Sequence, residues 1–345
     1  MTAPLETDVA VIGAGPAGLF AVFELGMLKL QSVLIDALAE PGGQCAALYP
    51  EKPIYDIPAH PVIAAGELIA ALERQIAPFD TPRLLGQRVV GLEGAAGAFR
   101  LRTDHGTQVH ARAVILAAGT GAFGPNRPPL AGIEAYEATG AVRYFVRMRD
   151  ALRGKRVVIA GGGDSAVDWA LALRDIARVA VVHRRPRFRA APDSAAALEA
   201  AAARGELELV IPYQLHALHG ADGVLSAVEV ATLAGERRLV AADVLLAFFG
   251  LAAELGPIAA WGVALDQNRV RIDPASCETS LPGVFAIGDV AVYPGKLKLI
   301  LQGFSEAAMA AHAIFPLARP GEALHFTYST TSGVPAGQGG SSIAV

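Results

Sequence analysis

The sequence predicts an α/β fold made of two Rossmann-like dinucleotide-binding domains, with the second domain inserted into the first. Two observations predict this fold. A unit of strand, glycine-rich turn and helix lies near the N-terminus and recurs in the middle of the chain, and such a unit is the core of a nucleotide-binding domain. The chain also has 345 residues, which is enough for two domains that each bury their own core.

The composition is that of a globular protein and excludes several classes of function. Hydrophobic residues make up 53% of the chain and charged residues 18%. The formal net charge of -4 argues against nucleic-acid binding, because phosphates are neutralised by a basic surface. Cys45 and Cys277 are the only cysteines, and neither has metal-ligand spacing around it. Neither a disulfide framework nor a metal site is expected.

The N-terminus predicts a cytoplasmic protein. Glu6 and Asp8 precede the first apolar run, where a secretory signal would carry positive charge. That run, residues 9–23, is interrupted by glycines and a proline and is too short to span a bilayer. The two isolated cysteines suit a reducing compartment. We therefore expect a soluble location and no membrane partner.

The first unit reads DVAVIGAGPAGL over residues 8–19, an apolar β-branched strand that runs into a glycine turn and a helical pattern. In such a turn Gly13 permits the tight bend, Gly15 lets a pyrophosphate approach the backbone, and Gly18 lets the helix pack on the strand. Pro16 is counted with the same turn, and the helix N-terminus supplies amide donors for phosphate. The next strand, SVLIDA, ends in Asp36, which is placed to accept hydrogen bonds from a ribose hydroxyl.

The second unit reads KRVVIAGGGDSAVDWALAL over residues 155–173 and repeats the order of strand, turn and helix. Gly161, Gly163 and Ala166 occupy the three positions of the turn. Asp164 belongs to the same predicted binding site. The strand RVAVVHRR follows the helix.

The two units differ at one position that selects the ligand. Counted from the first glycine of each turn, Asp36 and Arg184 fall at the same distance. An acid there repels a 2'-phosphate and suits the ribose of FAD, whereas Arg184 and Arg185 would pair with the 2'-phosphate of NADP(H). His183 and Arg189 are further candidates. The alternative is that HRRPRFRA is an ordinary solvated basic loop.

The chain is expected to cross between domains in two segments that each read as a buried strand running into glycines, namely residues 111–132 and 241–256. The predicted FAD-binding domain comprises residues 1–119 and 249–345, with a C-terminal extension from about 320 to 345. The predicted NADP(H)-binding domain comprises residues 120–248.

The C-terminal third contains GVFAIGD, a strand that ends at Asp289, and a helix is expected to start near Gln302. An acid at the carboxyl end of a strand faces the ligand crevice of an open α/β sheet and can hold a ribityl hydroxyl. The helix start can stabilise negative charge on a flavin. The alternative is that Asp289 is simply a turn residue.

The sequence resembles the thioredoxin-reductase-like ferredoxin/flavodoxin–NADP reductases of bacteria. The resemblance is carried by VIGAGPAGLF, GGQCAALYPEKPIYDIPAHP, AAGTGAFGP, GGGDSAVDWA, VVHRRPRFRA, GVFAIGDV and HFTYSTTSG. One departure from thioredoxin reductases matters most. Residues 136–155 and 161–175, where those enzymes carry a C-x-x-C dithiol, contain no cysteine. Reduction of a substrate through an internal disulfide is therefore excluded, and electrons taken from NADPH are expected to leave from the flavin.

The glycine turns and the resemblance together imply two sets of binding residues. For FAD they are Gly13, Gly15, Pro16, Gly18, Asp36, Gln44, Tyr49, Val89, Phe123, Asp289 and Thr330. For NADP(H) they are Gly161, Gly163, Asp164, Ala166, His183, Arg184, Arg185 and Arg189.

Tyr49 and Tyr328 are the residues that the resemblance places against the flavin, one on each face, and no acid or base residue is expected. Tyr328 could instead be an exposed aromatic in a tail, and His325 and Phe326 are neighbouring candidates. Cys45 is expected to be a small buried residue rather than a redox thiol. We expect Tyr55 to pack as part of the structure.

The implied function is that of an FAD-dependent ferredoxin (or flavodoxin)–NADP(+) reductase, with hydride exchange between NADPH and flavin N5 and single-electron exchange with an iron–sulfur or FMN protein. The resemblance also implies a homodimer. Two alternatives remain, a general NADPH diaphorase or quinone reductase and a non-catalytic FAD-binding sensor or interaction protein. Because such carriers are acidic, basic residues are expected to steer their docking, and the candidates are Lys52, Lys296 and Lys298. The alternative is that these are ordinary surface lysines.

Overall fold

The structure is a computed structural model that describes residues 3–324 and 333–335, with the backbone alone at 122–125 and 251–253. The chain forms two compact units, residues 1–123 with 253–345, and residues 124–252. The sequence places the two crossings a few residues earlier. Within the described residues, no helix combines the length and the apolar character needed to cross a membrane.

Seven strands form the main sheet of the first unit: β1 (Leu5–Ile12), β2 (Ser32–Asp36), β5 (Arg83–Leu85), β6 (Val89–Ala95), β7 (Ala98–Thr103), β8 (Gln108–Leu116) and β21 (Val284–Ala286). Their order is β5-β2-β1-β8-β7-β6, and β21 pairs with the end of β8. β7 runs antiparallel to its two neighbours, β6 and β8, whereas β2, β5, β8 and β21 run parallel to β1.

The register of the parallel strands brings their carboxyl ends to one edge of the sheet. Ile12 is level with Ile35 on β2 and with Leu116 on β8. Leu116 is in turn level with Ala286 on β21. Loops that follow these strands therefore meet at the same edge, although they come from distant parts of the sequence.

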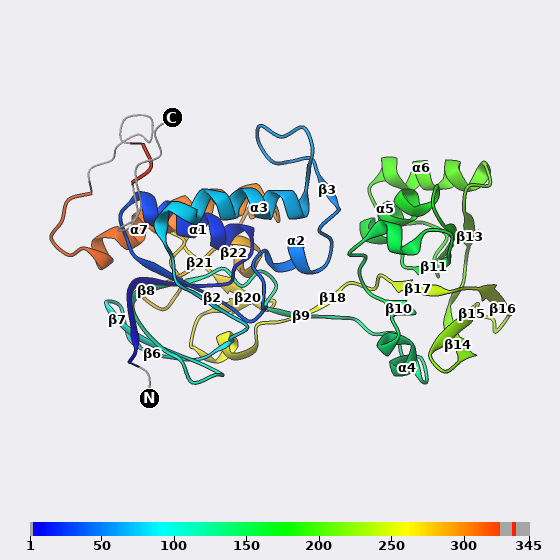
Figure 1. Cartoon of the computed structure of the whole chain (residues 1–345), viewed down its shortest axis with the longest axis horizontal. Coiled ribbons are helices and arrows are strands. Elements are labelled where there is room, and N and C mark those ends of the chain that lie inside the picture. The colour runs from blue at the N-terminus through cyan, green and yellow to red at the C-terminus, as the bar shows by residue number, and fades with distance from the viewer. Residues whose placement is uncertain (1–2, 325–332, 336–345) are drawn as a thin grey trace. The chain divides into compact units, whose positions relative to one another are not determined.

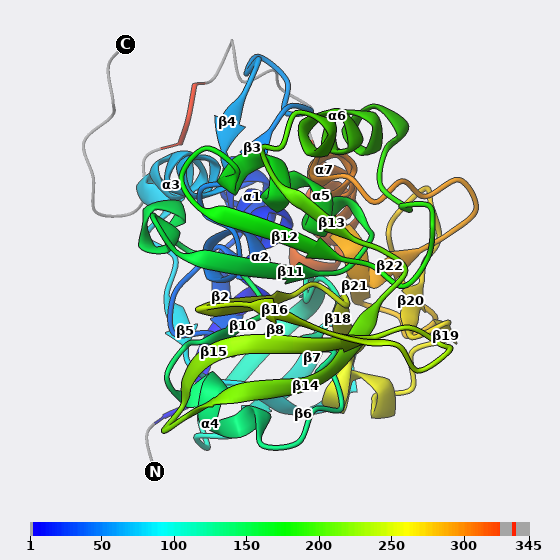
Figure 2. The ribbon, with the colours of Figure 1, turned by 90° about the vertical axis from the view of Figure 1, so that its right-hand side faces the viewer.

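The helical segments of this unit are α1 (Pro16–Met27), α2 (Gly43–Ala47), α3 (Ala65–Ile76) and α7 (Ile300–Ala318), with short 3-10 turns at η1 (Ala77–Phe79), η3 (Gly256–Ala260) and η4 (Gly288–Val290). Figures 1 and 2 show α1 between α3 and α7, over the sheet. One core of buried side chains joins these helices to the strands. Smaller pairings join β3 (Pro53–Ile54) to β4 (Ile63–Ala64), and β20 (Arg269–Arg271) to β19 (Leu265–Asp266) and β22 (Ala291–Val292).

α3 illustrates why these residues form helices. Leu68, Ile69, Leu72 and Ile76 are buried and recur at the spacing of one helix face. At its start, the carboxylate of Glu67 accepts a hydrogen bond from the backbone N–H of residue 64 at 3.1 Å, which satisfies a donor that the helix itself leaves free.

The second unit has a five-stranded parallel sheet: β10 (Val142–Arg143), β11 (Arg156–Ala160), β12 (Arg178–Val182), β13 (Glu208–Val210) and β17 (Val244–Ala247). The order is β10-β17-β11-β12-β13. Around it are α4 (Ile133–Ala138), η2 (Arg149–Leu152), α5 (Asp164–Leu173), α6 (Pro192–Ala203) and an antiparallel sheet of β14 (Gln214–Ala221), β15 (Val224–Ala231) and β16 (Arg237–Ala241). In Figure 2, this antiparallel sheet lies below β11 and β12, whereas α6 lies above them.

The parallel strands of this unit are apolar on both faces because both faces are covered. Val157 and Ile159 of β11 pack in a cluster with residues of α5 and α6. Val158 and Ala160 pack in a second cluster with residues of β15 and α4. A strand buried on both sides reads as a continuous apolar run, as the sequence has it. The predicted fold class, two Rossmann-like units with one inserted into the other, is confirmed. The two connecting strands, β9 (Ala122–Pro125) and β18 (Leu251–Glu254), pair with each other.

Candidate functional site

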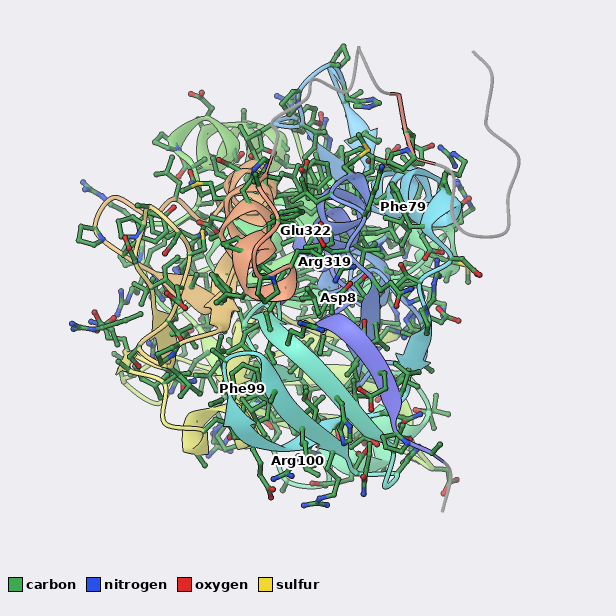
Figure 3. All side chains as sticks on the ribbon, turned by 90° about the vertical axis from the view of Figure 1, so that its left-hand side faces the viewer. Asp8, Phe79, Phe99, Arg100, Arg319 and Glu322 are labelled. Carbon is green, nitrogen blue, oxygen red and sulfur yellow. The ribbon has the colours of Figure 1, made fainter. Side chains whose placement is uncertain are left out.

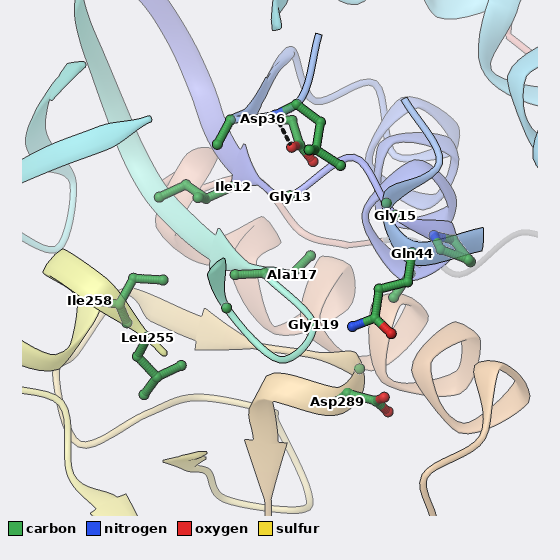
Figure 4. Close-up of a pocket in the computed structure, with 18 of the residues that line it drawn as sticks. Ile12, Gly13, Gly15, Asp36, Gln44, Ala117, Gly119, Leu255, Ile258 and Asp289 are labelled. Atoms are coloured by element: carbon green, nitrogen blue, oxygen red, sulfur yellow. Dashed lines mark hydrogen bonds between the residues drawn. The ribbon is translucent and has the colours of Figure 1, made fainter. Parts of the chain in front are cut away.

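A pocket of about 470 Å³ lies at the carboxyl edge of the first unit's sheet, within the size range of ligand sites. Asp36 lies at one end and Asp289 at the other, with Gly13, Gly15 and Gly119 between them (Figure 4). Of the residues predicted to bind FAD, the following line this pocket: Gly13, Gly15, Pro16, Asp36, Gln44, Tyr49, Val89 and Asp289.

The three glycines of the first turn have different physical tasks. A Cβ on Gly13 would lie 2.3 Å from the carbonyl oxygen of Ala117, and a Cβ on Gly18 would lie 1.8 Å from that of Gly13. These two positions are therefore closed by the protein itself. A Cβ on Gly15 would meet no atom within 4 Å. The space beside Gly15 is open toward the pocket, at the first residue before α1, where a pyrophosphate can approach backbone amides.

Asp36 is held rigidly at the end of β2. Its Oδ2 accepts a hydrogen bond from the N–H of Ala14 at 2.6 Å, and its Oδ1 accepts one from the N–H of Leu38 at 2.8 Å. Burial raises the pKa of the carboxyl, while the two backbone hydrogen bonds lower it. Each oxygen keeps a lone pair that a ribose hydroxyl could use.

Gln44 reaches the pocket from α2 and is oriented by a residue that the sequence did not single out. Its Nε2 donates to the hydroxyl of Thr120 at 2.8 Å. Because Thr120 follows β8 and Gln44 follows β2, the bond joins two loops at the carboxyl edge. Their pairing depends on tertiary structure, so no local pattern could have predicted it.

Tyr49 and Cys45 line the same pocket as Asp289. The Cys45 thiol and the Tyr49 hydroxyl interact with each other, and both interact electrostatically with the Asp289 carboxyl. Burial raises the pKa of the Cys45 thiol to about 11, and it raises the pKa of the Tyr49 hydroxyl as well. Both groups are therefore protonated at neutral pH.

The start of α7 also lines the pocket, through Lys298, Leu299, Ile300 and Gly303. The helix begins at Ile300, two residues before the expected start near Gln302. No polar side chain caps it, which explains why the usual start signal is missing from the sequence.

The expectation that Lys296 steers a docking partner is wrong. Its side chain is only 3% exposed, and its ammonium group forms an ion pair with Glu306. The local sequence suggests a surface lysine, because it gives no sign of the buried acid that pairs with Lys296. That acid lies on another element, α7. Lys298 is exposed and remains a candidate, whereas Lys52 has a partner of its own in the structure.

The expectation that Tyr55 packs as part of the structure is also wrong, because Tyr55 is 71% exposed. It follows β3 in the loop that leads to β4. Tyr328 and Thr330 lie outside the described residues, as do His325 and Phe326. Phe123 lies in β9, where the backbone alone is described.

The glycine turn of the second unit repeats the geometry of the first. A Cβ on Gly161 would lie 2.8 Å from the carbonyl oxygen of Phe248, whereas a Cβ on Gly163 would meet nothing within 4 Å. Gly163 is the first residue before α5, and Ala166, buried in the helix, takes the third position of the motif. The open position again lies where a phosphate can reach the helix N-terminus.

Four exposed arginines follow β12, namely Arg184, Arg185, Arg187 and Arg189. No ion pair joins them to another residue of the described chain. Two bonds hold their loop against the glycine turn: the N–H of Arg189 donates to the carbonyl of Gly162 at 2.7 Å, and Asp164 accepts from the N–H of Ala191 at 2.8 Å. Arg187 was not among the residues predicted to bind NADP(H), although it lies in the same basic run. Unpaired guanidinium groups at this place can bind a phosphate.

His183 is buried, unlike the arginines that follow it. Its ring stacks on Phe188 with 5.2 Å between ring centroids, and it fills the space that a side chain on residue 162 would need. Burial lowers its pKa, and the neighbouring arginines lower it further. The neutral ring therefore shapes the loop.

Within the described residues, no group of three or more His, Cys, Asp or Glu side chains could hold a metal ion. The chain instead offers groups that suit two dinucleotides, one in each unit. Each unit offers an open glycine before a helix, followed by an acid in one unit and by arginines in the other.

Residues 7–313 match the sequence profile of the pyridine nucleotide-disulphide oxidoreductase family. The chain is 72% identical over 332 residues to a ferredoxin–NADP reductase of Granulibacter bethesdensis, which covers 96% of this chain and 95% of that protein. It is 60% identical to a ferredoxin–NADP reductase of Rhodospirillum rubrum, over 96% of this chain and 97% of that protein.

Among solved structures, the thioredoxin reductases of Lactococcus lactis and of T. acidophilum are similar in fold. Each has a TM-score of 0.76 at 23% identity and covers 90% of this chain, with 99% and 98% of their own chains matched. These likenesses concern the fold alone.

Proposed function

The chain belongs to the pyridine nucleotide-disulphide oxidoreductase family, and we propose that within this family it is an FAD-dependent ferredoxin–NADP reductase. The observation that carries the proposal is that relatives of that name match almost the whole chain, including both nucleotide-binding units. The pocket and the arginine loop support it because each offers the groups that its ligand needs.

FAD would occupy the pocket of the first unit. Gly15 leaves room for the pyrophosphate, Asp36 would accept a hydrogen bond from the adenosine ribose, and Asp289 would accept one from the ribityl chain. Gln44 and Val89 would contact the cofactor from the pocket walls, and we propose that Tyr49 stacks on the flavin. Thr330 and Phe123 stay proposals from the sequence for the same site.

NADP(H) would bind to the second unit. Gly163 leaves room for its pyrophosphate at the start of α5, and Arg184 and Arg185 would bind the 2'-phosphate. Arg187 and Arg189 add positive charge to the same loop, which favours a phosphorylated ribose over the hydroxyl of NAD(H).

No thiol relay takes part in the proposed reaction. Cys45 and Cys277 are both free and buried, and burial raises both thiol pKa values, so neither is an accessible thiolate at neutral pH. When bound, FAD accepts the two electrons of NADPH as hydride and passes them singly to two molecules of a one-electron carrier. The part of the chain itself would be to bind and orient the cofactor.

We propose ferredoxin as the electron carrier, with flavodoxin as a second acceptor. The exposed Lys298 at the pocket is the lysine best placed to attract an acidic carrier. A homodimer, a cytoplasmic location, and a role for Tyr328 in covering the second flavin face complete the proposal.

Anaerobic titration of the FAD-loaded protein with NADPH tests the function. We expect NADPH to bleach the flavin absorbance, and the reduced protein to reduce ferredoxins from a panel that also contains flavodoxins. If NADPH does not bleach the flavin, the enzyme proposal is wrong. If it bleaches the flavin but every protein carrier stays oxidised while quinones are reduced, the protein is a diaphorase.

A further inference from the structure

A buried polar cluster lies behind the pocket at α7, centred on Glu306. The Glu306 side chain is 1% exposed. Its Oε2 accepts a hydrogen bond from the N–H of Gly288 at 2.7 Å, and its Oε1 accepts one from the hydroxyl of Tyr293 at 2.8 Å. The buried ammonium of Lys296 binds the same Oε1. Gln302 closes the cluster by donating to the Tyr293 hydroxyl at 2.8 Å.

The cluster joins two stretches of chain that both reach the pocket. Gly288 and Asp289 line it from η4, and Lys298, Leu299 and Ile300 line it from the start of α7. Tyr293 and Lys296 lie on the loop between these stretches. Among the described residues, Glu306 is therefore the side chain that is hydrogen-bonded to both the turn and the loop.

The turn at Gly288 lies close to α1 and is bonded to α7. Gly288 has a φ of +71°, and a Cβ added there would lie 3.2 Å from Ala17 on α1. The turn is thus confined by α1 and also held by Glu306. Since Asp289 is the next residue, any shift of the Gly288 amide moves the Asp289 carboxylate.

Stability alone does not call for a charged pair at this position. Removing two ions from water is costly, and replacing a buried ion pair by apolar residues of similar size is often neutral or stabilising. The other buried side chains of α7 are mostly alanine, isoleucine and phenylalanine, so an apolar residue would suit the helix. An apolar residue could not accept the Gly288 hydrogen bond.

We propose that Glu306 is a positioning residue for FAD, which fixes the Gly288–Asp289 turn and the loop to Ile300 in the geometry that the cofactor needs. The inference rests on the proposed FAD site. Lys296 neutralises the charge of Glu306, so that this strong acceptor is buried beside the pocket without leaving an unpaired charge.

Two double variants that differ in one acceptor test the proposal. K296M/E306Q and K296M/E306L both remove the two charges, and glutamine and leucine have similar volumes. Only the glutamine can still accept from the Gly288 N–H. We expect the dissociation constant of FAD from the folded apoprotein to be about tenfold higher for K296M/E306L, because a buried amide loses its partner. Quenching of flavin fluorescence during titration measures it.

The same chain offers a matched control at the far end of α7. Asp8 and Arg319 form an ion pair there, with Arg319 Nη2 2.8 Å from Asp8 Oδ2 (Figure 3), and neither residue lines the pocket. The variant D8N/R319M should lower the melting temperatures of apoprotein and holoprotein by the same amount. In the K296M/E306L variant, the difference between the melting temperatures of holoprotein and apoprotein should instead become smaller, because a ligand that binds more weakly stabilises the protein less.

If K296M/E306L fails to fold, K296M/E306N replaces it, because asparagine is one methylene too short to reach Gly288. Equal FAD affinities of the variants with and without the acceptor would overturn the proposal. Failure of the wild-type protein to bind FAD would overturn the proposed function itself, so the two failures can be told apart.

Discussion

At the scale of single residues, we expect Gly15 to serve ligand binding and Gly18 to serve folding, although both belong to one motif. Gly15 has a φ of -71°, which any residue can adopt, and open space where its Cβ would lie. Gly18 has a backbone carbonyl in that place. The same residue type is thus present for two different reasons.

Gly15→Ala should leave the free energy of unfolding of the apoprotein unchanged within about 0.5 kcal/mol, as surface substitutions usually do. It should nevertheless lower the affinity for FAD by about tenfold or more, because the added methyl group occupies the space of the pyrophosphate. Gly18→Ala is the control and should prevent stable folding. Denaturant unfolding of apoprotein and FAD titration check both. Unchanged FAD binding in Gly15→Ala would contradict the assignment of this turn.

Cys45 and Cys277 should be inert thiols. Burial raises their pKa values to about 11 and about 12, so both stay protonated between pH 7 and about pH 9. Iodoacetamide at pH 8 is expected to leave the native protein unlabelled and fully active, and Cys45→Ser should keep NADPH-driven activity. Mass spectrometry of the treated protein measures labelling, with urea-unfolded protein as the positive control. Rapid loss of activity on labelling of Cys45 would revive a redox role.

At the scale of elements, we propose that the loop after β12 selects between NADP(H) and NAD(H). Arg184→Ala should raise the Michaelis constant for NADPH by about tenfold or more, the usual effect of losing a charge-assisted hydrogen bond, and should leave that for NADH nearly unchanged. Arg178→Ala is the matched control, because Arg178 is an exposed arginine at the other end of β12. Equal kinetics with NADPH and NADH in the wild-type protein would refute the phosphate assignment.

Local pattern predicted those elements whose signals lie within a short stretch of sequence. The strands, glycine turns and helices around Gly13 and Gly161 were predicted because apolar runs and turn residues report their own conformation. Lys296 and Tyr55 were misjudged because their surroundings come from elsewhere. The acid that pairs with the buried Lys296 lies on α7. The exposure of Tyr55 depends on how the loop between β3 and β4 packs on the rest of its unit. Glu306 and Thr120 gave no local signal, since each acts through a partner on another element.

At the scale of the whole molecule, the division into units carries a prediction about folding. Residues 124–252 contain a complete parallel sheet and two buried clusters, and their two ends meet where the N–H of Asn126 donates to the carbonyl of Gly250 at 3.0 Å. Residues 1–123 lack β21 and α7, which complete the sheet and core of the first unit.

A fragment of residues 124–252 should therefore fold alone and bind NADP(H) within a few-fold of the affinity of the full chain, because its glycine turn and arginines are all its own. A fragment of residues 1–123 should not fold, since the strand beside β8 and the longest helix of its unit are missing. Circular dichroism during thermal unfolding and calorimetric titration with NADP+ check the first fragment, and NAD+ serves as the control ligand. A cooperative unfolding transition in residues 1–123, or its absence in residues 124–252, would contradict the view that the second unit is self-contained and the first is completed by the C-terminal third.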